Sequence, residues 1–169
     1  MDVPAEDSPQ AEFGLRFRVA SLNDSAKLIP LINAAFSIET FLEGTRTDEV
    51  RLAEMMQTGE ILVGEDAAGQ LLCAVYTELH GKRGYLGMLA VDPAHQGSGL
   101  ARRIAEAAEE RFRADGCEAV DITVLSLRPE LPRIYRRFGY VEGGTEETRI
   151  TQRLKDGRQC HSIPMTKQL

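Results

Sequence analysis

The chain has 169 residues, of which 43% are apolar and 27% are charged, and its net charge is −6. This length and composition predict one globular domain with a sizeable core. The acidic balance argues against a nucleic-acid partner, because proteins that bind nucleic acid normally carry a basic excess or stripe. No apolar run approaches the roughly 18 residues of a membrane span, so we expect no membrane partner either.

The cysteines and the N-terminus indicate where the protein resides. Cys73, Cys117 and Cys160 lie far apart and form neither a disulfide framework nor a CxxC metal motif. We therefore predict reduced thiols, a cytoplasmic location and no metal site, with Cys73 as a small core residue. Residues 1–13 are acidic and lack the apolar region of a signal peptide, so they are predicted to be a flexible tail before a domain over 14–169.

The first half of the chain shows strand and helix patterns in alternation. Apolar residues at helical spacing predict a first helix with cap candidates within 21–25, and Pro30 could kink or split it. Asp48 is predicted to cap a second helix, which Gly59 ends. The predicted elements are a strand over 15–20, a helix to about 36, a helix over about 48–58, and a hairpin of strands 60–65 and 71–79.

The second half begins with residues 84–91, in which both the odd and the even positions are apolar. This pattern predicts a central strand that is covered on both faces. In the helix after it, Glu109 is expected on the solvent side in an i,i+4 pair with Arg113. The further predicted elements are that helix from Leu100 to Gly116, a strand over 119–125, a short helix ended by Gly139, a strand beginning at Tyr140, and a last strand over about 159–167.

The junction between the central strand and its helix carries a glycine loop. The apolar run ends at Asp92, the turn 96–99 reads Gln-Gly-Ser-Gly, and an Ala-rich helix follows at once. Free N–H groups and the positive end of the helix dipole suit a phosphate or pyrophosphate there. No lysine lies near, which excludes a P-loop, and Arg102 occupies the third slot of a dinucleotide fingerprint.

Two motifs resemble those of the GNAT N-acetyltransferases. Gln96, Gly99 and Ala101 match the Gln-x-x-Gly-x-Ala pattern of that family's acetyl-CoA loop. Downstream, Tyr135 and 139–140 match its Tyr-x-x-x-Gly-Phe/Tyr segment, separated from the loop by one helix and one strand as in the family. The resemblance covers roughly residues 15–167 and implies a single-domain α/β (α+β) GNAT fold, with a mixed, mainly antiparallel central sheet flanked by helices.

The resemblance also implies acetyl-CoA as the co-substrate. It implies that two central strands splay to admit the pantetheine arm and that a backbone N–H near Leu89 polarises the thioester. Arg102 and Arg103 add positive charge, although a solvated helix face paired with Glu106 is an equal alternative. Arg128 stands where the family often has Asn, which leaves the contacts of that loop open. The implied donor-binding residues are Leu89, Ala90, Val91, Gln96, Gly97, Ser98, Gly99, Leu100, Ala101 and Arg102.

Acetyl transfer to an amine requires a polarised carbonyl, a neutral amine and a protonated leaving thiolate. Tyr135 is the candidate proton donor, with plain packing as the alternative. Glu78 is the preferred candidate base, and His80, Glu39 and Glu43 are the other candidates, each of which could instead be a solvated charge. His95 and His161 are expected to be structural or surface residues.

These features predict an acetyl-CoA-dependent N-acetyltransferase that acts on the primary amine of a small molecule or peptide. Glu39, Glu43, Glu78 and the negative net charge favour a cationic acceptor. The alternative is a catalytically silent acyl-CoA-binding or sensing domain, since residues 128–132 depart from the family and no base is obvious. The sequence leaves the acyl chain length and the quaternary state open, a homodimer included.

Overall fold

The computed structural model describes residues 14–143, 154–155 and 160–169. The predicted tail, 1–13, lies outside the described residues. The elements in chain order are β1 (Arg16–Val19), η2 (Leu22–Asp24), α1 (Ser25–Ala35), α2 (Glu49–Thr58), β2 (Glu60–Glu65), β3 (Leu71–His80), β4 (Arg83–Val91), η3 (Pro93–His95), α3 (Leu100–Ala114), β5 (Ala119–Leu125), α4 (Leu131–Arg137), β6 (Val141–Glu142) and β7 (Ser162–Gln168).

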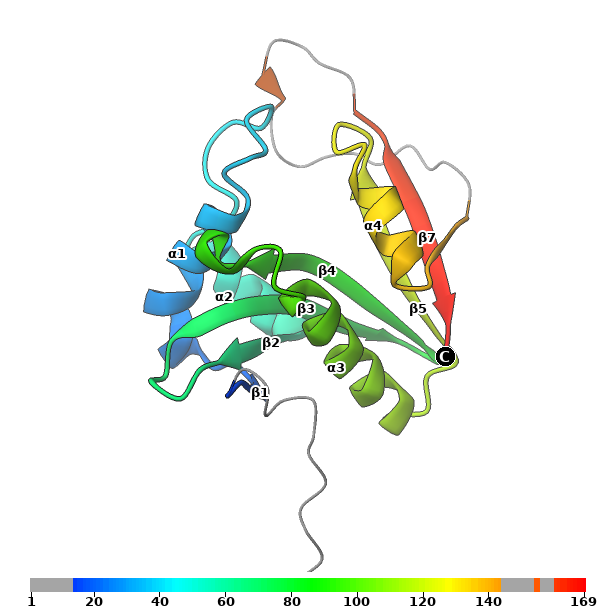
Figure 1. Cartoon of the computed structure of the whole chain (residues 1–169), viewed down its shortest axis with the longest axis horizontal. Helices are drawn as coiled ribbons and strands as arrows, with labels where there is room; N and C mark the ends of the chain where they lie inside the picture. The colour runs from blue at the N-terminus through cyan, green and yellow to red at the C-terminus, as the bar shows by residue number, and fades with distance from the viewer. Residues whose placement is uncertain (1–13, 144–153, 156–159) are drawn as a thin grey trace, which may run out of the picture.

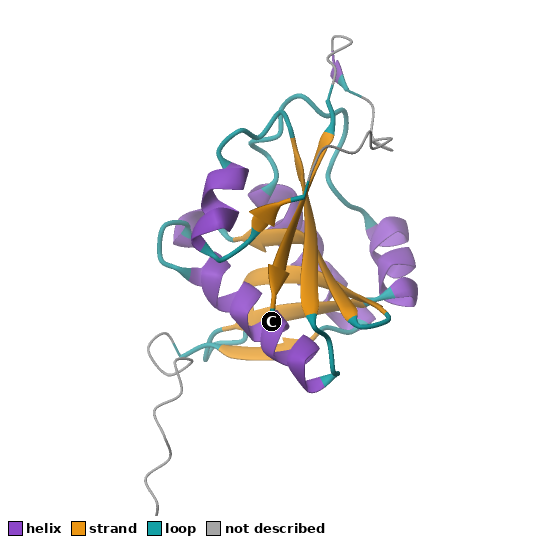
Figure 2. Ribbon diagram, turned by 90° about the vertical axis from the view of Figure 1, so that its right-hand side faces the viewer, coloured by secondary structure: helices purple, strands orange, loops and turns teal. Residues whose placement is uncertain are grey.

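The described strands form one mixed sheet in the order β1-β2-β3-β4-β5-β7-β6. Neighbouring strands pair antiparallel except for β4 and β5, which are parallel. Helices lie on both sides of the sheet (Figure 1, Figure 2), with α1 packed on one face and α3 on the other. The predicted α/β fold with a mixed, mainly antiparallel sheet is confirmed.

The central strand β4 contributes to the core on both faces, as its doubly apolar pattern predicts. Leu86 and Val91 pack in the cluster beneath α3. Ala90 packs in the cluster beneath α1, with Tyr85 and Met88 against it. Burial of these side chains removes apolar area from water on both faces and fixes β4 in the middle of the sheet.

β4 and β5 are joined at one end only. Their register runs from Arg83↔Ala119 to Leu86↔Ile122, whereas β4 continues to Val91. Figure 1 shows the two strands diverging beyond that point. A bulge adds to the divergence: Met88 has φ 48 where the register of β3 and β4 shifts. The sheet therefore consists of two wings, β1-β2-β3-β4 and β5-β7-β6, in agreement with the implied splaying.

The proline in the first helix does not split it. α1 runs unbroken from Ser25 to Ala35 with Pro30 inside. Leu28 and Ile32 are fully buried against the sheet, and this packing outweighs the hydrogen bond that the proline ring cannot donate. Upstream, Ser21 caps the short turn η2 rather than α1, in a capping box with Asp24.

The prediction that Glu109 lies on the solvent side of its helix and pairs with Arg113 is wrong. Glu109 is 1% exposed, and its carboxylate binds the Lys167 ammonium at 2.7 Å and accepts a hydrogen bond from Tyr140 at 3.3 Å. The charge faces β7, 58 residues away in the sequence, so helical spacing alone could not reveal its partner.

Cys73, in contrast, is a core residue as predicted, with 0% exposure. No helix among the described residues is long and apolar enough to cross a membrane.

Candidate active site

The glycine loop leads from the end of β4 into the N-terminus of α3. Gly97 has φ 79 and Gly99, the N-cap of α3, has φ 83, a left-handed conformation that glycine adopts without steric cost. A Cβ at either glycine would meet nothing within 4 Å, so open space lies beside both. Because Gly99 has no side chain to cap the helix, the first N–H groups of α3 remain accessible to a ligand.

The loop is held by bonds within itself. The Asp92 carboxylate accepts from the N–H of Ala94 at 2.9 Å, and the Ser98 hydroxyl donates to the carbonyl of His95. Gln96 is exposed on this loop. These short-range bonds shape the turn without occupying the helix N-terminus, so the loop fits an anion such as a pyrophosphate.

The predicted donor-binding residues occupy one continuous stretch. Leu89 and the two residues after it lie in the part of β4 that β5 leaves unpaired, and Leu100 begins α3. Arg102 binds Glu106 at 3.1 Å, as the helix-face alternative expects, and its guanidinium carbon lies 5.8 Å from the centre of the Phe138 ring. The structure thus places β4, the loop and the first turn of α3 next to one another, with the charge of Arg102 matched by its own helix.

Tyr135 lies on α4, half-buried, with its ring edge-on to Phe138 at 5.7 Å and to Tyr140 at 5.8 Å. Burial raises the pKa of Tyr135 to about 12, and the charge of Arg128 opposes this rise. A proton passes favourably only to the group of higher pKa, so full transfer to a thiolate, whose acid has a pKa of about 8.5, costs roughly 5 kcal/mol. Tyr135 is therefore suited to donate a hydrogen bond rather than to surrender its proton.

Glu78 belongs to a group of four side chains on β3 and β4, which we name the Tyr85 cluster: Tyr76, Glu78, His80 and Tyr85. Tyr76 donates to Glu78 at 2.7 Å, and the Nε2 atom of His80 lies 2.7 Å from the other carboxylate oxygen. The Tyr85 ring stacks on His80 at 6.1 Å and meets Tyr76 edge-on at 6.5 Å. The hydrogen bond of His80 and then that of Tyr76 lower the pKa of Glu78, so its carboxylate stays ionised and orients the imidazole.

The remaining candidate bases are placed differently. Glu43 is exposed, and the carboxylate of Glu39, 4% exposed, lies between two arginines. One oxygen of Glu39 binds Nη1 of Arg46 at 3.3 Å and the other binds Nη1 of Arg128 at 2.8 Å. We name Glu39, Arg46 and Arg128 the arginine bridge. Because both oxygens hold a guanidinium, Glu39 is a counter-ion rather than a base.

The arginine bridge joins the two wings of the sheet. Glu39 and Arg46 stand on the loop between α1 and α2, and Arg128 stands before α4. Figure 1 shows these loops on opposite sides of the divergence of β4 and β5. Arg128 is only 15% exposed, and the residue that departs from the family pattern is thus a structural tie. Its partner lies 89 residues away, so no local motif signalled the pair.

The bridge also acts on the tyrosines. Burial raises the pKa of Tyr85, and the positive charge of Arg46 opposes this rise. Arg128 acts in the same direction on the pKa of Tyr135, which Tyr85 raises. Each arginine of the bridge therefore opposes the rise in the pKa of one tyrosine.

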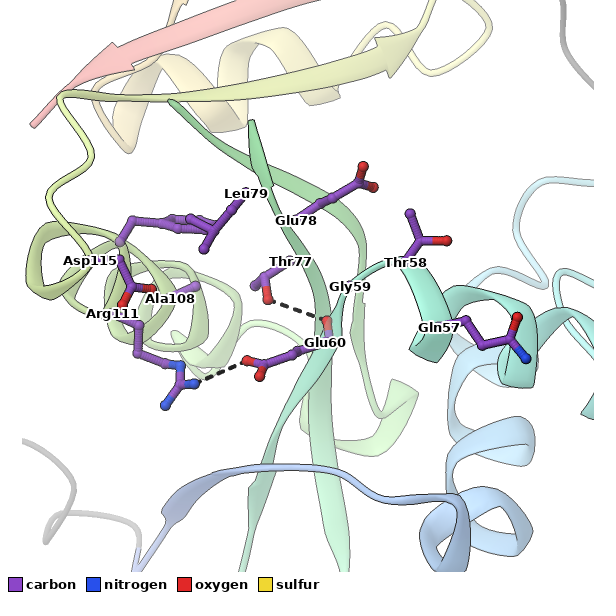
Figure 3. A pocket seen from close by; sticks show the side chains of 11 residues that line it. Gln57, Thr58, Gly59, Glu60, Thr77, Glu78, Leu79, Ala108, Arg111 and Asp115 are labelled. Carbon is purple, nitrogen blue, oxygen red and sulfur yellow. Dashed lines mark hydrogen bonds and ion pairs between the residues drawn. The ribbon is translucent and has the colours of Figure 1, made fainter. Parts of the chain in front are cut away.

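A separate cavity of about 500 Å³ lies between the end of α2, the end of β3 and the second half of α3. Figure 3 shows Leu79 directed toward α3 and the Glu78 carboxylate directed away from the ion pair of Arg111 and Glu60. Glu78 is the one predicted site residue in its lining. Its carboxylate belongs to the Tyr85 cluster, so this cavity is not the predicted site. Among the described residues, no group of three or more His, Cys, Asp or Glu is placed to hold a metal ion.

Comparison with protein families gives a match over most of the chain. The model described as an acetyltransferase (GNAT) domain matches residues 25–167. A mycothiol acetyltransferase of Propionibacterium freudenreichii subsp. shermanii is 28% identical over 150 residues, which cover 83% of this chain and 48% of that protein. The chain thus spans about half the length of this curated relative.

Solved structures share the fold at low sequence identity. The spermidine N-acetyltransferase of Vibrio cholerae, in complex with CoA and spermine, has a TM-score of 0.72 at 19% identity, with 92% of this chain and 95% of that one covered. The ribosomal-protein-alanine N-acetyltransferase of Brucella melitensis also has a TM-score of 0.72 at 19% identity, with 91% and 99% covered.

Proposed function

The chain belongs to the GNAT acetyltransferase family and is an acyltransferase, and from this we propose that it moves an acetyl group from acetyl-CoA to the primary amine of a small molecule or peptide. The observation that carries the proposal is the open glycine loop at the uncapped N-terminus of α3, next to the unpaired part of β4. We also propose a cytoplasmic location, which the three free thiols support.

The donor would be held mainly by backbone groups. The left-handed Gly97 and Gly99 allow close approach of a pyrophosphate, and the helix dipole favours its negative charge. Residues 89–91 offer peptide groups that lack a partner strand on the β5 side, to which the amides of the pantetheine arm can bind. When bound, acetyl-CoA supplies the thioester carbonyl that the acceptor nitrogen attacks.

For the acceptor, we propose that His80 and Glu78 remove the proton of the ammonium group. Imidazole is the commonest general base, and the ionised Glu78 fixes its orientation at 2.7 Å. The neutral nitrogen then forms the C–N bond, the C–S bond breaks, and the second proton of the nitrogen goes to the thiolate. Tyr135 donates a hydrogen bond to the leaving sulfur, which stabilises the charge that develops there.

The test is thiol release from acetyl-CoA in the presence of a panel of amines, with CoA binding measured separately by calorimetry. Glu78→Gln and His80→Gln should lower kcat by about tenfold to a thousandfold while CoA still binds. Glu118→Gln is the matched control, because this carboxylate is 71% exposed on the surface. CoA binding without acetylation of any amine would refute the proposal in favour of an acyl-CoA-sensing domain.

A further inference from the structure

We infer that the buried ion pair of Glu109 and Lys167 positions Tyr135 for the transfer, because it holds Tyr140, whose ring packs against that of Tyr135. We name Glu109, Lys167 and Tyr140 the Glu109 network. The inference rests on the proposed function, in which Tyr135 donates a hydrogen bond to the leaving sulfur. The members of the Glu109 network are positioning residues, since they act through Tyr135.

The Glu109 network joins three elements. Glu109 lies on α3, Lys167 on β7, and Tyr140 between α4 and β6. The Glu109 side chain is 2% exposed and Tyr140 is 1% exposed. The Lys167 ammonium binds one carboxylate oxygen at 2.7 Å and the other at 3.3 Å, and the Tyr140 hydroxyl donates to the second oxygen at 3.3 Å. One buried carboxylate therefore fixes both the ammonium and the phenol.

Tyr140 in turn fixes the place of Tyr135. The two rings meet edge-on at 5.8 Å, and the N–H of Tyr140 donates to the carbonyl of Tyr135 at 3.0 Å. A Cβ at Gly139 would lie 3.1 Å from Cε of Lys167, so the lysine stem packs against the chain where α4 ends. No hydrogen bond within the described part of the chain holds the Tyr135 hydroxyl, so its direction follows from the packing of its ring.

The helix α3 meets the aromatic side chains of α4 at a second point. The guanidinium carbon of Arg102 lies 5.8 Å from the centre of the Phe138 ring, and Phe138 meets Tyr135 edge-on at 5.7 Å. Arg102 and Glu109 are seven residues apart, which is about two helical turns, so they share one side of α3. The Tyr135 ring is thus held to the helix whose N-terminus we propose as the pyrophosphate site.

Stability alone does not account for a buried ion pair. Both charges lose hydration on burial, so apolar side chains of similar volume are often as stabilising as the pair. An ion pair differs from apolar packing in its geometry, because charge-assisted hydrogen bonds have defined lengths and directions. A variant that restores the stability without restoring these bonds therefore separates the two roles.

The test compares the wild-type protein with the double variant Glu109→Leu/Lys167→Met. Its unfolding midpoint in urea should lie close to that of the wild type. The kcat of thiol release from acetyl-CoA should nevertheless fall about threefold to tenfold, because a displaced Tyr135 hydroxyl stabilises the thiolate less well. The KM of acetyl-CoA should not change. Tyr140→Phe removes only the hydrogen bond to Glu109 and should lower kcat by a smaller factor.

Arg18→Gln is the matched control. It breaks an ion pair of similar exposure on the edge strand β1, where the Arg18 side chain is 29% exposed against 22% for Lys167. This variant should be less stable than the wild type and keep its kcat. The loss of an ion pair as such is thereby distinguished from the loss of the Glu109 network.

Two further readouts distinguish positioning from a purely structural role. In the Tyr135→Phe background the double variant should change kcat less than about twofold, because it acts through the Tyr135 hydroxyl. The chain has four tyrosines, so NMR spectra of protein with isotope-labelled tyrosine contain few ring signals, and Tyr135→Phe identifies the signal of Tyr135. That signal should shift in the double variant and in Tyr140→Phe, and stay in place in Arg18→Gln.

The outcomes separate this inference from the proposed function. Wild-type kcat in the folded double variant, or an equal loss of kcat with and without the Tyr135 hydroxyl, overturns the inference while the acetyltransferase function stands. If the wild-type protein binds CoA and acetylates no amine, the proposed function fails, and an unshifted Tyr135 signal then overturns the inference as well. Should the double variant fail to fold, Tyr140→Phe takes its place in each comparison.

Discussion

The substitution Gly99→Glu separates the role of the glycine loop from the stability of the helix that follows it. The residue lies at the N-terminus of α3 with φ 83, and Gly116, just past the other end of the same helix, has φ 84. A Cβ at either glycine would meet nothing within 4 Å. Gly116→Glu is therefore a matched control, which introduces the same side chain with the same backbone strain at the opposite end of the dipole.

The stability effects can be estimated for both variants. A left-handed non-glycine residue costs about 1–2 kcal/mol. A negative charge gains about 0.3–1 kcal/mol at a helix N-terminus and loses as much at the C-terminus. We expect Gly99→Glu to lower the free energy of unfolding by about 1 kcal/mol and Gly116→Glu by about 2 kcal/mol, as measured by urea denaturation.

CoA binding should respond in the reverse order. Two negative charges about 5 Å apart repel by roughly 3 kcal/mol at an effective dielectric constant of 20, so Gly99→Glu should weaken CoA binding at least a hundredfold. Gly116→Glu should bind CoA as the wild-type protein does. Isothermal calorimetry with CoA measures both. Unchanged affinity in the folded Gly99→Glu protein, or an equal loss in both variants, would refute the assignment of this loop to the pyrophosphate.

Three further outcomes are expected. Tyr135→Phe keeps the ring packed in place and should lower kcat about tenfold to a hundredfold with less than about 1 kcal/mol of lost stability; equal turnover in steady-state assays would dismiss the hydrogen bond to sulfur. Lys167→Met leaves Glu109 buried without its cation and should cost about 2–3 kcal/mol in urea denaturation. The double variant with Glu109→Leu should recover most of this loss, and simple additivity would contradict the coupling. Finally, the Arg18 guanidinium lowers the pKa of Asp24 to about 2, below its ordinary value near 4. The ion pair therefore stabilises the fold above about pH 4, and this stabilisation is lost as the pH falls toward 2. Arg18→Gln should flatten the dependence of the free energy of unfolding on pH in that range. Acid titrations followed by circular dichroism that run parallel for the two proteins would refute this expectation.

The elements could be predicted where short-range periodicity reports burial. Residues 84–91 are apolar at odd and even positions alike because β4 packs on both faces of the sheet. Asp48 caps α2 by accepting a hydrogen bond from the N–H of Arg51 at 2.9 Å. At Gly59 the predicted helix end is confirmed but the reason differs. Its φ is −151, an extended conformation, and a Cβ there would lie 2.3 Å from the carbonyl oxygen of Thr77. The glycine serves a close approach to β3 rather than a left-handed turn.

The candidate site could be predicted only in part, for the same reason. The glycine loop is a continuous stretch, so its spacing is visible in the sequence. Glu78 and His80 are two residues apart on one strand and share a face of the sheet, which makes their pairing readable too. The arginine bridge depends on Glu39 and Arg128, which the fold brings together from opposite wings. No pattern in one sequence reveals a contact of that kind.

The unpaired part of β4 bears on how freely sequences of this fold can vary. A peptide N–H or C=O group is the same whatever side chain it carries, so a ligand bound along a strand edge places few demands on residue identity. Only positions that need a left-handed backbone or an absent side chain, such as Gly97 and Gly99, are restricted. Main-chain recognition, which we propose for the donor, would let side chains vary widely, and these structural relatives share the fold at 19% sequence identity.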